Sequence, residues 1–264
     1  MDLQSRNLTV PRGTALFAKY KSGTQIPGPF RELGNTPEFT LAREAETLPH
    51  YSSRVGFRTL DEEVAIEATL TGSVTTDDMK SENVAFFFMN EVKTITVTAS
   101  SSLVETFEEV KAGDLYQLGF SDTNPSGARK VSTVVVTDGA TTSPATFVLD
   151  EDYILDADLG TVYIPAGSNA IGGDVKVAYG VSASTREQIA AGETQVEGAL
   201  KFISNNPIGP QFDITFPRVR LSPNGDLALI MDPESSEWQQ LPLSISVMKK
   251  GNLALAYRDS RPVA

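Results

Sequence analysis

The sequence alternates apolar and polar residues with a period of two in many separate segments, and this pattern constrains the fold most. Such alternation predicts strands that have one buried and one exposed face. Turn sequences rich in proline, glycine and asparagine separate the segments, for example at 206–210 and 223–226, and their spacing suits antiparallel sheets. We therefore expect a mainly β fold. The alternating segments are 38–42, 64–71, 95–97, 175–179, 212–216, 241–247 and 253–257.

Two segments favour a helix instead. Residues 75–78 (Thr-Thr-Asp-Asp) suit the N-terminus of a helix, and the residues that follow, up to Met89, include no glycine or proline. We expect one helix over 77–89, with its aromatic end packed on a sheet. A weaker helical pattern covers 185–191 and would end at Gly192.

Charge is unevenly distributed along the chain. The segment 94–184 contains twelve acidic and four basic residues, and it is rich in threonine, serine, valine and glycine. The whole chain carries a net charge of −12, so this segment holds two thirds of it. We expect a β core domain made of residues 1–93 plus 185–264, interrupted by an inserted acidic β subdomain at 94–184.

Composition excludes several classes of function. The chain has no cysteine and one histidine, His50, which excludes disulfide scaffolds and thiolate catalysis and makes histidine-ligated zinc improbable. There is no Gly-x-Ser-x-Gly sequence around a nucleophile and no glycine loop leading into a phosphate-binding helix. A glycosidase would need two carboxylates flanking its substrate, and pairs such as Glu44 and Glu46 are commonplace in an acidic chain. We expect no enzyme activity, no catalytic or metal site and no cofactor.

The densest acidic cluster, from Asp150 to Asp158, has two interpretations. Its four aspartates could supply several of the oxygen ligands that calcium needs. The alternative, which we favour, is a β-hairpin: residues 153–155 form one strand, 156–160 turn, and 161–164 form the return strand.

We also form expectations about location. The first seven residues are polar, without the apolar stretch of a secretory signal, and no segment approaches the roughly 20 apolar residues that cross a bilayer. So acidic a chain is not expected to bind nucleic acid by charge neutralisation, which requires clustered lysine and arginine. We expect no membrane insertion and folding in a cytoplasm.

An ordered set of motifs resembles one known family. These motifs are Gly34–Leu41, Glu46–Ser53, Asp61–Val64, Ala199–Pro210, Phe216–Leu227 and Glu237–Leu241. As a set they resemble the major tail tube protein of long-tailed bacteriophages. The resemblance covers most of 12–93 and 195–250.

The resemblance implies a fold, an assembly and partners. It implies a β-sandwich or barrel-like domain with one flanking helix, six copies of which form a ring. Rings stack into a hollow tube in the virion tail, assembled in the bacterial host cytoplasm, and DNA passes through it without specific binding. Implied partners are other copies of the chain and the tape-measure, terminator and distal tail proteins. A type VI secretion-like tube protein is the near alternative, and a β-rich adhesin or carbohydrate-binding module or a β-rich hydrolase are alternatives from other classes.

Two groups of residues carry the expected assembly. Residues 47–63 are expected to form a long polar loop that also holds apolar side chains, and the resemblance implies that this loop reaches the neighbouring ring. Its stacking residues are His50, Tyr51, Arg54, Val55, Phe57 and Leu60. Strand alternation places a set of acids on one exposed face of the core, where we expect them to line the channel and repel DNA. These are Glu38, Glu44, Glu46 and Glu67. The inserted subdomain would then lie on the outside of the tube.

Overall fold

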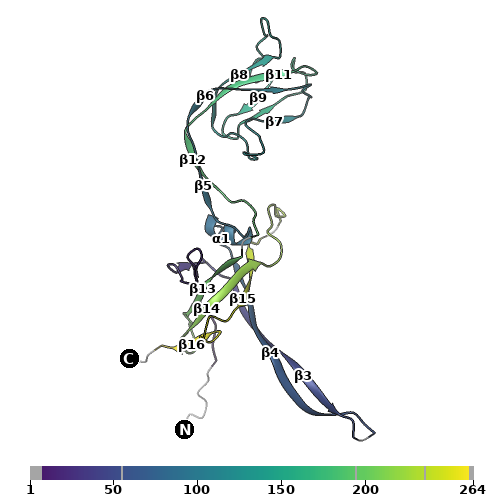
Figure 1. Ribbon diagram of the computed structural model, residues 1–264. Coiled ribbons are helices and arrows are strands. Elements are labelled where there is room, and N and C mark those ends of the chain that lie inside the picture. Colours follow the sequence, from purple (N-terminus) through teal and green to yellow (C-terminus); the bar gives the residue numbers. More distant parts are fainter. Residues whose placement is uncertain (1–7, 55, 194, 235, 262–264) are drawn as a thin grey trace. The chain divides into compact units, whose positions relative to one another are not determined.

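The structure is a computed structural model that describes residues 8–54, 56–193, 195–234 and 236–261 (Figure 1). The chain divides into two compact units. Unit 1 comprises Met1–Lys93 and Ile189–Ala264, and unit 2 comprises Thr94–Gln188. The boundary between residues 93 and 94 is the one predicted from the sequence. The second boundary follows residue 188, four residues beyond the predicted one after residue 184. Strands dominate both units, which confirms a mainly β fold with one helix.

Unit 1 contains one large antiparallel sheet. Its order is β2-β1-β13-β14-β15-β4-β3, and β16 pairs with β14 outside this path. The sheet therefore joins strands from both ends of the chain. The elements are β1 (Gly13–Lys19), β2 (Arg31–Glu32), β3 (Glu38–Ser52), β4 (Thr59–Thr76), α1 (Ser81–Phe87), β13 (Val196–Ser204), β14 (Phe212–Pro223), β15 (Leu241–Val247) and β16 (Tyr257–Ser260).

The sheet of unit 1 curls around an apolar core. Phe39 of β3 meets Phe202 of β13 edge to face, with ring centroids 5.7 Å apart, although these two strands are not neighbours in the sheet. On the core face, the largest fully buried side chain is Phe216 of β14. The helix closes one end of this core, where Phe86 packs edge to face on Phe17 at 5.2 Å.

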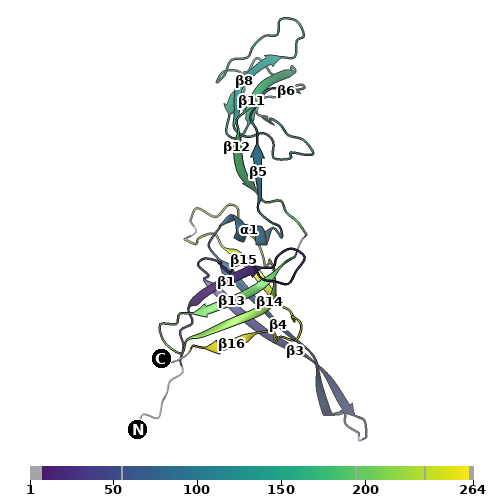
Figure 2. The same cartoon turned by 60° about the vertical axis from the view of Figure 1, so that its left-hand side comes forward.

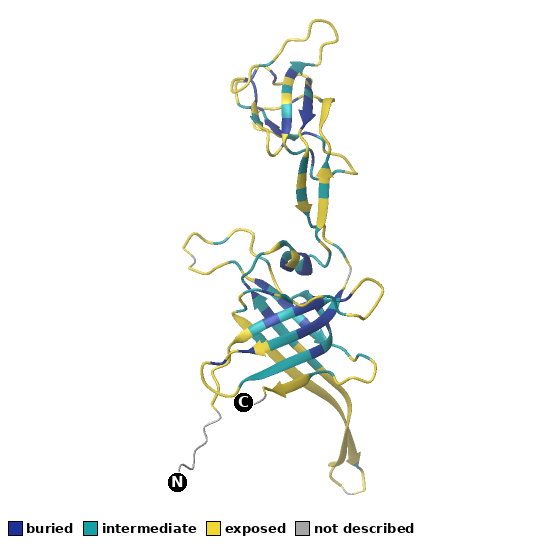
Figure 3. Ribbon diagram, turned by 90° about the vertical axis from the view of Figure 1, so that its left-hand side faces the viewer, coloured by how far each residue is buried: buried dark blue, intermediate teal, exposed yellow. Residues whose placement is uncertain are grey.

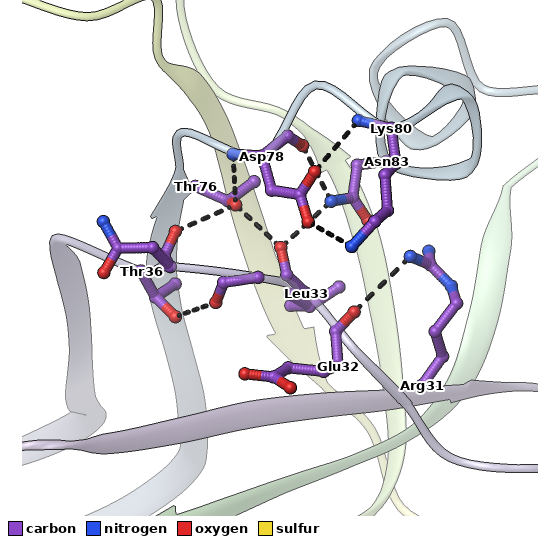
Figure 4. A network of polar contacts seen from close by, with 10 residues as sticks. Arg31, Glu32, Leu33, Thr36, Thr76, Asp78, Lys80 and Asn83 are labelled. Carbon is purple, nitrogen blue, oxygen red and sulfur yellow. Dashed lines mark hydrogen bonds and ion pairs between the residues drawn. The ribbon is translucent and has the colours of Figure 1, made fainter.

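A buried polar network fixes the start of the helix (Figure 4). Thr76 Oγ1 donates to the carbonyl oxygen of Leu33 (2.7 Å) and accepts from the backbone N–H of Asp78 (3.1 Å). The fully buried Asn83 donates from Nδ2 to the carbonyl oxygens of Leu33 and Asp78, each at 2.9 Å. These bonds hold the segment between β2 and β3 against α1.

The helix is shorter than the sequence predicted. It begins at Ser81 instead of Asp77, and Lys80 at its N-cap makes no side-chain capping bond. The polar residues that resembled caps serve the preceding turn instead, since Thr76 and Asp78 bond to backbone groups there. The prediction of one helix with a buried aromatic end was right, and its first turn was wrong.

Unit 2 has its own core and three small sheets. Their orders are β7-β10-β9, β6-β11-β8 and β12-β5. Val110, Leu118, Val136 and Val177 are among its fully buried side chains. The elements are β5 (Lys93–Val97), β6 (Ser100–Phe107), β7 (Leu115–Gln117), β8 (Val131–Asp138), β9 (Ile154–Asp156), β10 (Thr161–Tyr163), β11 (Val175–Val181) and β12 (Ser184–Gln188).

The second predicted helix, over 185–191, is wrong. Residues 184–188 form β12, which pairs with β5. The strand alternates between exposed and half-buried positions, and Arg186 and Gln188 both donate side-chain hydrogen bonds to Ser126 Oγ, at 3.0 and 3.2 Å. Pairing with a distant strand outweighs the weak helical propensity of a short polar segment.

Unit 1 is expected to fold without unit 2, because each unit has a core of its own. The junctions lie together: Gly192 N–H donates to the Phe88 carbonyl (2.9 Å), and Asn90 Nδ2 donates to the Ala190 carbonyl (2.8 Å). A deletion variant that joins Lys93 to Ile189 through a short glycine linker should retain its β circular-dichroism spectrum and a cooperative thermal transition. An unfolded or aggregated product would contradict the division.

Candidate assembly surface on the β3–β4 hairpin

The β3–β4 hairpin, the longest in the described part of the chain, extends beyond the strand that pairs with it in the sheet of unit 1. β3 and β4 pair with each other from Glu38/Thr75 to Ser52/Thr59, whereas β15 pairs with β4 only from Leu70 onward. Residues 44–69 therefore form a two-stranded ribbon that extends beyond the other strands of unit 1 (Figure 2). Almost all of this ribbon is exposed (Figure 3).

The predicted long loop at 47–63 is wrong, because most of it is strand. Only residues 53–58 connect β3 to β4. The alternation was hidden by two register shifts, at Glu46/Thr47 and at His50/Tyr51, and by Pro49. Among the described residues β3 is an edge strand, and edge strands are where proline is tolerated in sheets.

Apolar side chains form pairs across the ribbon. Leu48 lies opposite Val64, and Tyr51 lies opposite Leu60; residues that pair in this way share a face. All four are exposed, between 37% and 62% of their surface, and Phe57 in the connecting turn is 83% exposed. Exposed apolar clusters of this kind mark interaction surfaces.

Polar contacts organise the end of the ribbon. The Arg58 guanidinium lies 4.0 Å from the centroid of the Tyr51 ring, His50 Nδ1 lies 2.5 Å from Asp61 Oδ1, and Thr47 Oγ1 donates to Glu63 Oε1 at 2.5 Å. His50 thus makes a local polar contact in a strand. Of the predicted stacking residues, Arg54 is exposed in the turn, and Val55 lies outside the described residues.

The predicted acidic face is present on the same ribbon. Glu46 lies directly opposite Glu67, and Glu44 lies two residues earlier on the same face. Together they line a shallow hollow of about 380 Å³ with Ala45 and Thr69. Glu38 shares this face further along β3 and is also exposed. Like charges placed directly opposite each other are unfavourable, so this face suits open water or a role in repulsion.

The edge of β3 was not foreseen from the sequence. It is a 15-residue strand whose outer edge is unpaired among the described residues, whereas β2 at the other end of the sheet has two residues. An edge of this length presents a row of free backbone N–H and C=O groups and can pair with another chain.

The acidic cluster of unit 2 stabilises a turn. Asp152, 6% exposed, accepts hydrogen bonds from the backbone N–H of Val148 (2.8 Å) and from Asn169 N–H and Nδ2 (3.0 and 2.9 Å). These bonds, led by the one from Val148, lower the pKa of Asp152. The favoured hairpin is confirmed, with β9 and β10 paired from Ile154/Tyr163 to Asp156/Thr161. In the described part of the chain, no three histidine, aspartate or glutamate side chains are placed to hold a metal ion.

Two further observations concern the class of protein. Within the described ranges, no helix is long and apolar enough to span a bilayer. The chain matches, over residues 10–253, the family described as "Protein of unknown function UCP028589". It belongs to this family. The match to UCP028589 includes the β3–β4 hairpin and residues of both units. No curated protein matches the chain significantly.

Proposed function

We propose that this protein is the structural subunit of a phage tail tube, polymerising as stacked hexameric rings. One observation carries the proposal: the ribbon of residues 44–69 exposes paired apolar side chains, and within the described residues no strand outside the hairpin pairs with it. A two-stranded ribbon is at best marginally stable alone in water. Contact with another copy would bury Leu48, Tyr51, Phe57, Leu60 and Val64.

The sheet edges support ring formation. The β3 edge of one copy can extend the sheet of the next copy, and this contact joins two different surfaces. Contacts of that kind close into a ring or run on as a filament. A closed ring leaves no long β3 edge exposed, which removes the hazard of non-specific pairing. The number six comes from the resemblance to tail tube proteins.

Stacking would use the ribbon. It extends beyond the sheet of its own unit, so it can cross from one ring to the next and place Tyr51 and Phe57 against the neighbouring ring. The separately folded unit 2 would occupy the outside of the tube. The geometry serves a type VI secretion-like tube equally well; the resemblance favours the phage tail, with the tape-measure, terminator and distal tail proteins as partners in the virion.

The acidic face would line the channel. Glu44, Glu46 and Glu67 converge on one face of the ribbon, and Glu38 extends the face along β3. A negatively charged wall repels phosphate, so DNA slides through without binding, which is the inverse of a lysine- and arginine-lined groove.

Reversing the wall charge should hinder DNA passage. Virions that carry Glu38→Lys, Glu44→Lys and Glu67→Lys are expected to assemble, because these exposed side chains make no contact that holds the subunit together. Ejection should slow, most strongly at low salt, because lysine–phosphate contacts form with release of counterions. The matched control is Glu108→Lys, Asp122→Lys and Glu151→Lys on unit 2, three equally exposed acids. Unchanged ejection from the first variant at low salt would exclude these acids from the channel.

The assembly itself is tested by electron microscopy of the purified full chain over a range of concentrations. Rings or tubes support the proposal. Protein that stays monomeric, or that binds a glycan array as a monomer, supports the adhesin alternative instead.

A further inference from the structure

An apolar groove opens where the curled sheet of unit 1 meets itself. It has a volume of about 200 Å³ and is lined by residues of β3, β13 and β14, of which β3 is distant in sequence from the other two. Its three aromatic rings form a chain, with centroids 5.7 Å apart for Phe39–Phe202 and 6.3 Å apart for Phe202–Phe212. The lining residues are Pro11, Phe39, Leu41, Phe202, Phe212 and Ile214.

The rim of this groove is mainly basic. The Arg258 guanidinium lies 4.1 Å from the centroid of the Phe212 ring, and Arg258 pairs with Ile214, so both face the groove. Arg12 and one acid, Glu38, line a hollow that adjoins the groove. The next pair along these strands is Asp213 with Asp259. Because side chains alternate along a strand, both acids point to the face opposite that of Ile214 and Arg258.

A surface of opposite charge to the groove rim lies in the loop between β14 and β15, residues 224–240. Three large apolar side chains of this loop are almost fully exposed: Leu229 at 83%, Ile230 at 93% and Trp238 at 83%. The loop has four acidic residues and no lysine or arginine. Gln239 Nε2 donates to the Ala228 carbonyl at 2.5 Å. This hydrogen bond joins the two arms of the loop next to Leu229 and Trp238, which adjoin the bonded residues in the sequence.

The loop and the groove lie at opposite ends of one strand. Phe212 and Ile214 are at the start of β14, and the loop leaves from its last residue, Pro223. A strand of 12 residues spans roughly 35 Å. The acidic, apolar loop of one copy therefore matches the basic-rimmed apolar groove of a second copy, in a head-to-tail arrangement.

We propose that the 224–240 loop of each copy docks into the groove of the next copy, with Trp238 as the buried anchor. The contact rests on the proposed self-assembly and adds to it a second interface, distinct from the ribbon. The groove is large enough for one aromatic side chain. Tryptophan and arginine dominate the energetics of protein interfaces, and acids of the loop would meet Arg12 and Arg258. A head-to-tail contact of this kind joins copies in series.

Trp238 reports on this contact directly, because it is the one tryptophan of the chain. In the monomer its fluorescence should show the emission of a water-exposed indole and full quenching by acrylamide. On assembly, the emission should move to shorter wavelength and quenching should fall. Trp238→Ala should raise the concentration for half-assembly by about 30-fold or more, the effect typical of a hot spot.

A groove variant shows that the contact is between copies. Leu41→Glu places an acid in the groove at a side chain that is 42% exposed, so the fold should survive; Arg258→Glu at the exposed rim is the second variant. Either should keep Trp238 exposed at concentrations where the natural chain assembles. The Trp238→Ala chain has an intact groove and no tryptophan emission of its own. Adding it to the Leu41→Glu chain should therefore restore the emission shift of Trp238 in the Leu41→Glu chain.

The results of these experiments distinguish the loop–groove contact from the proposed tube. Tubes in which Trp238 stays fully quenchable overturn the loop–groove contact and leave the proposed function standing. Burial of Trp238 in short oligomers, without rings or tubes, supports the contact and overturns the proposed function. Failure of the mixture to restore the shift, with both variants folded by circular dichroism, overturns the contact, and a chain that stays monomeric at every concentration overturns both.

Discussion

The double variant Tyr51→Ala, Phe57→Ala is expected to stop polymerisation while the monomer keeps its stability. Phe57 is 83% exposed, and Tyr51 lies against Arg58 and opposite Leu60, both of the same ribbon. The change therefore removes little from the folded monomer, and exposed substitutions usually alter stability by no more than about 0.5 kcal/mol. Assembly loses two aromatic anchors, each of the kind that contributes about 2 kcal/mol or more at an interface. Sedimentation and thermal unfolding measure the two effects separately.

The matched control keeps both aromatic rings and removes the Tyr51 hydroxyl. Tyr51→Phe leaves the ring available to Arg58 and to a neighbouring copy, so its polymerisation should equal that of the natural chain. Tubes of normal length from the double alanine variant would show that the ribbon does not hold the assembly together. An unfolded double variant would show instead that the ribbon packs on its own unit.

Phe216→Ala is expected to have the largest effect on stability. Phe216 lies on β14 at the centre of the unit 1 core, fully buried with Leu200 of β13 and Leu243 of β15. Removing a buried phenylalanine ring costs about 3–5 kcal/mol, from lost burial and from the cavity left behind. Native domains are stable by about 5–15 kcal/mol, so unit 1 should lose a large part of its stability. Urea unfolding followed by circular dichroism measures the change.

Phe57→Ala is the control for this experiment, because it makes the same chemical change at an exposed site. It should leave the urea midpoint of unit 1 unchanged. The unfolding of unit 2, which has a separate core around Val136 and Val177, should not respond to Phe216→Ala. Similar losses from Phe216→Ala and Phe57→Ala would contradict the assignment of core and surface.

The acidic character of the ribbon suggests how early aggregation is avoided. The β3 edge is long, but Glu44, Glu46 and Glu67 lie together on one face beside it. Copies that approach at random meet like charges, and the net charge of −12 adds to that repulsion. Repulsion between exposed charges weakens as salt screens it, so we expect copies to associate more readily as ionic strength rises.

The strand content and one acidic face could be predicted from local pattern alone. Glu38, Glu44 and Glu46 are separated by even numbers of residues in a part of β3 that has no register shift, so strand alternation places them on one face. The helix start at Ser81 could not be predicted, because Thr76 and Asp78 bond to a turn that exists only once Leu33 lies beside them. The strand at 184–188 depends on β5, some 90 residues earlier.

The candidate sites needed the three-dimensional structure for a similar reason. The 47–63 segment looked like a loop because two register shifts and Pro49 interrupt its alternation. The groove combines Phe39, Phe202 and Phe212, which no local pattern connects. The exposed edge of β3 is a property of the sheet order and has no sequence signal of its own.

Electron microscopy of the purified chain, at increasing protein concentration and ionic strength, tests the central claim most directly. The account predicts hollow rings and stacked tubes, with a bore wide enough for a DNA duplex and with unit 2 on the outer wall. It also predicts that the Tyr51→Ala, Phe57→Ala variant forms no tubes. Monodisperse single copies of the natural chain at every concentration and salt, or solid filaments without a bore, would contradict it.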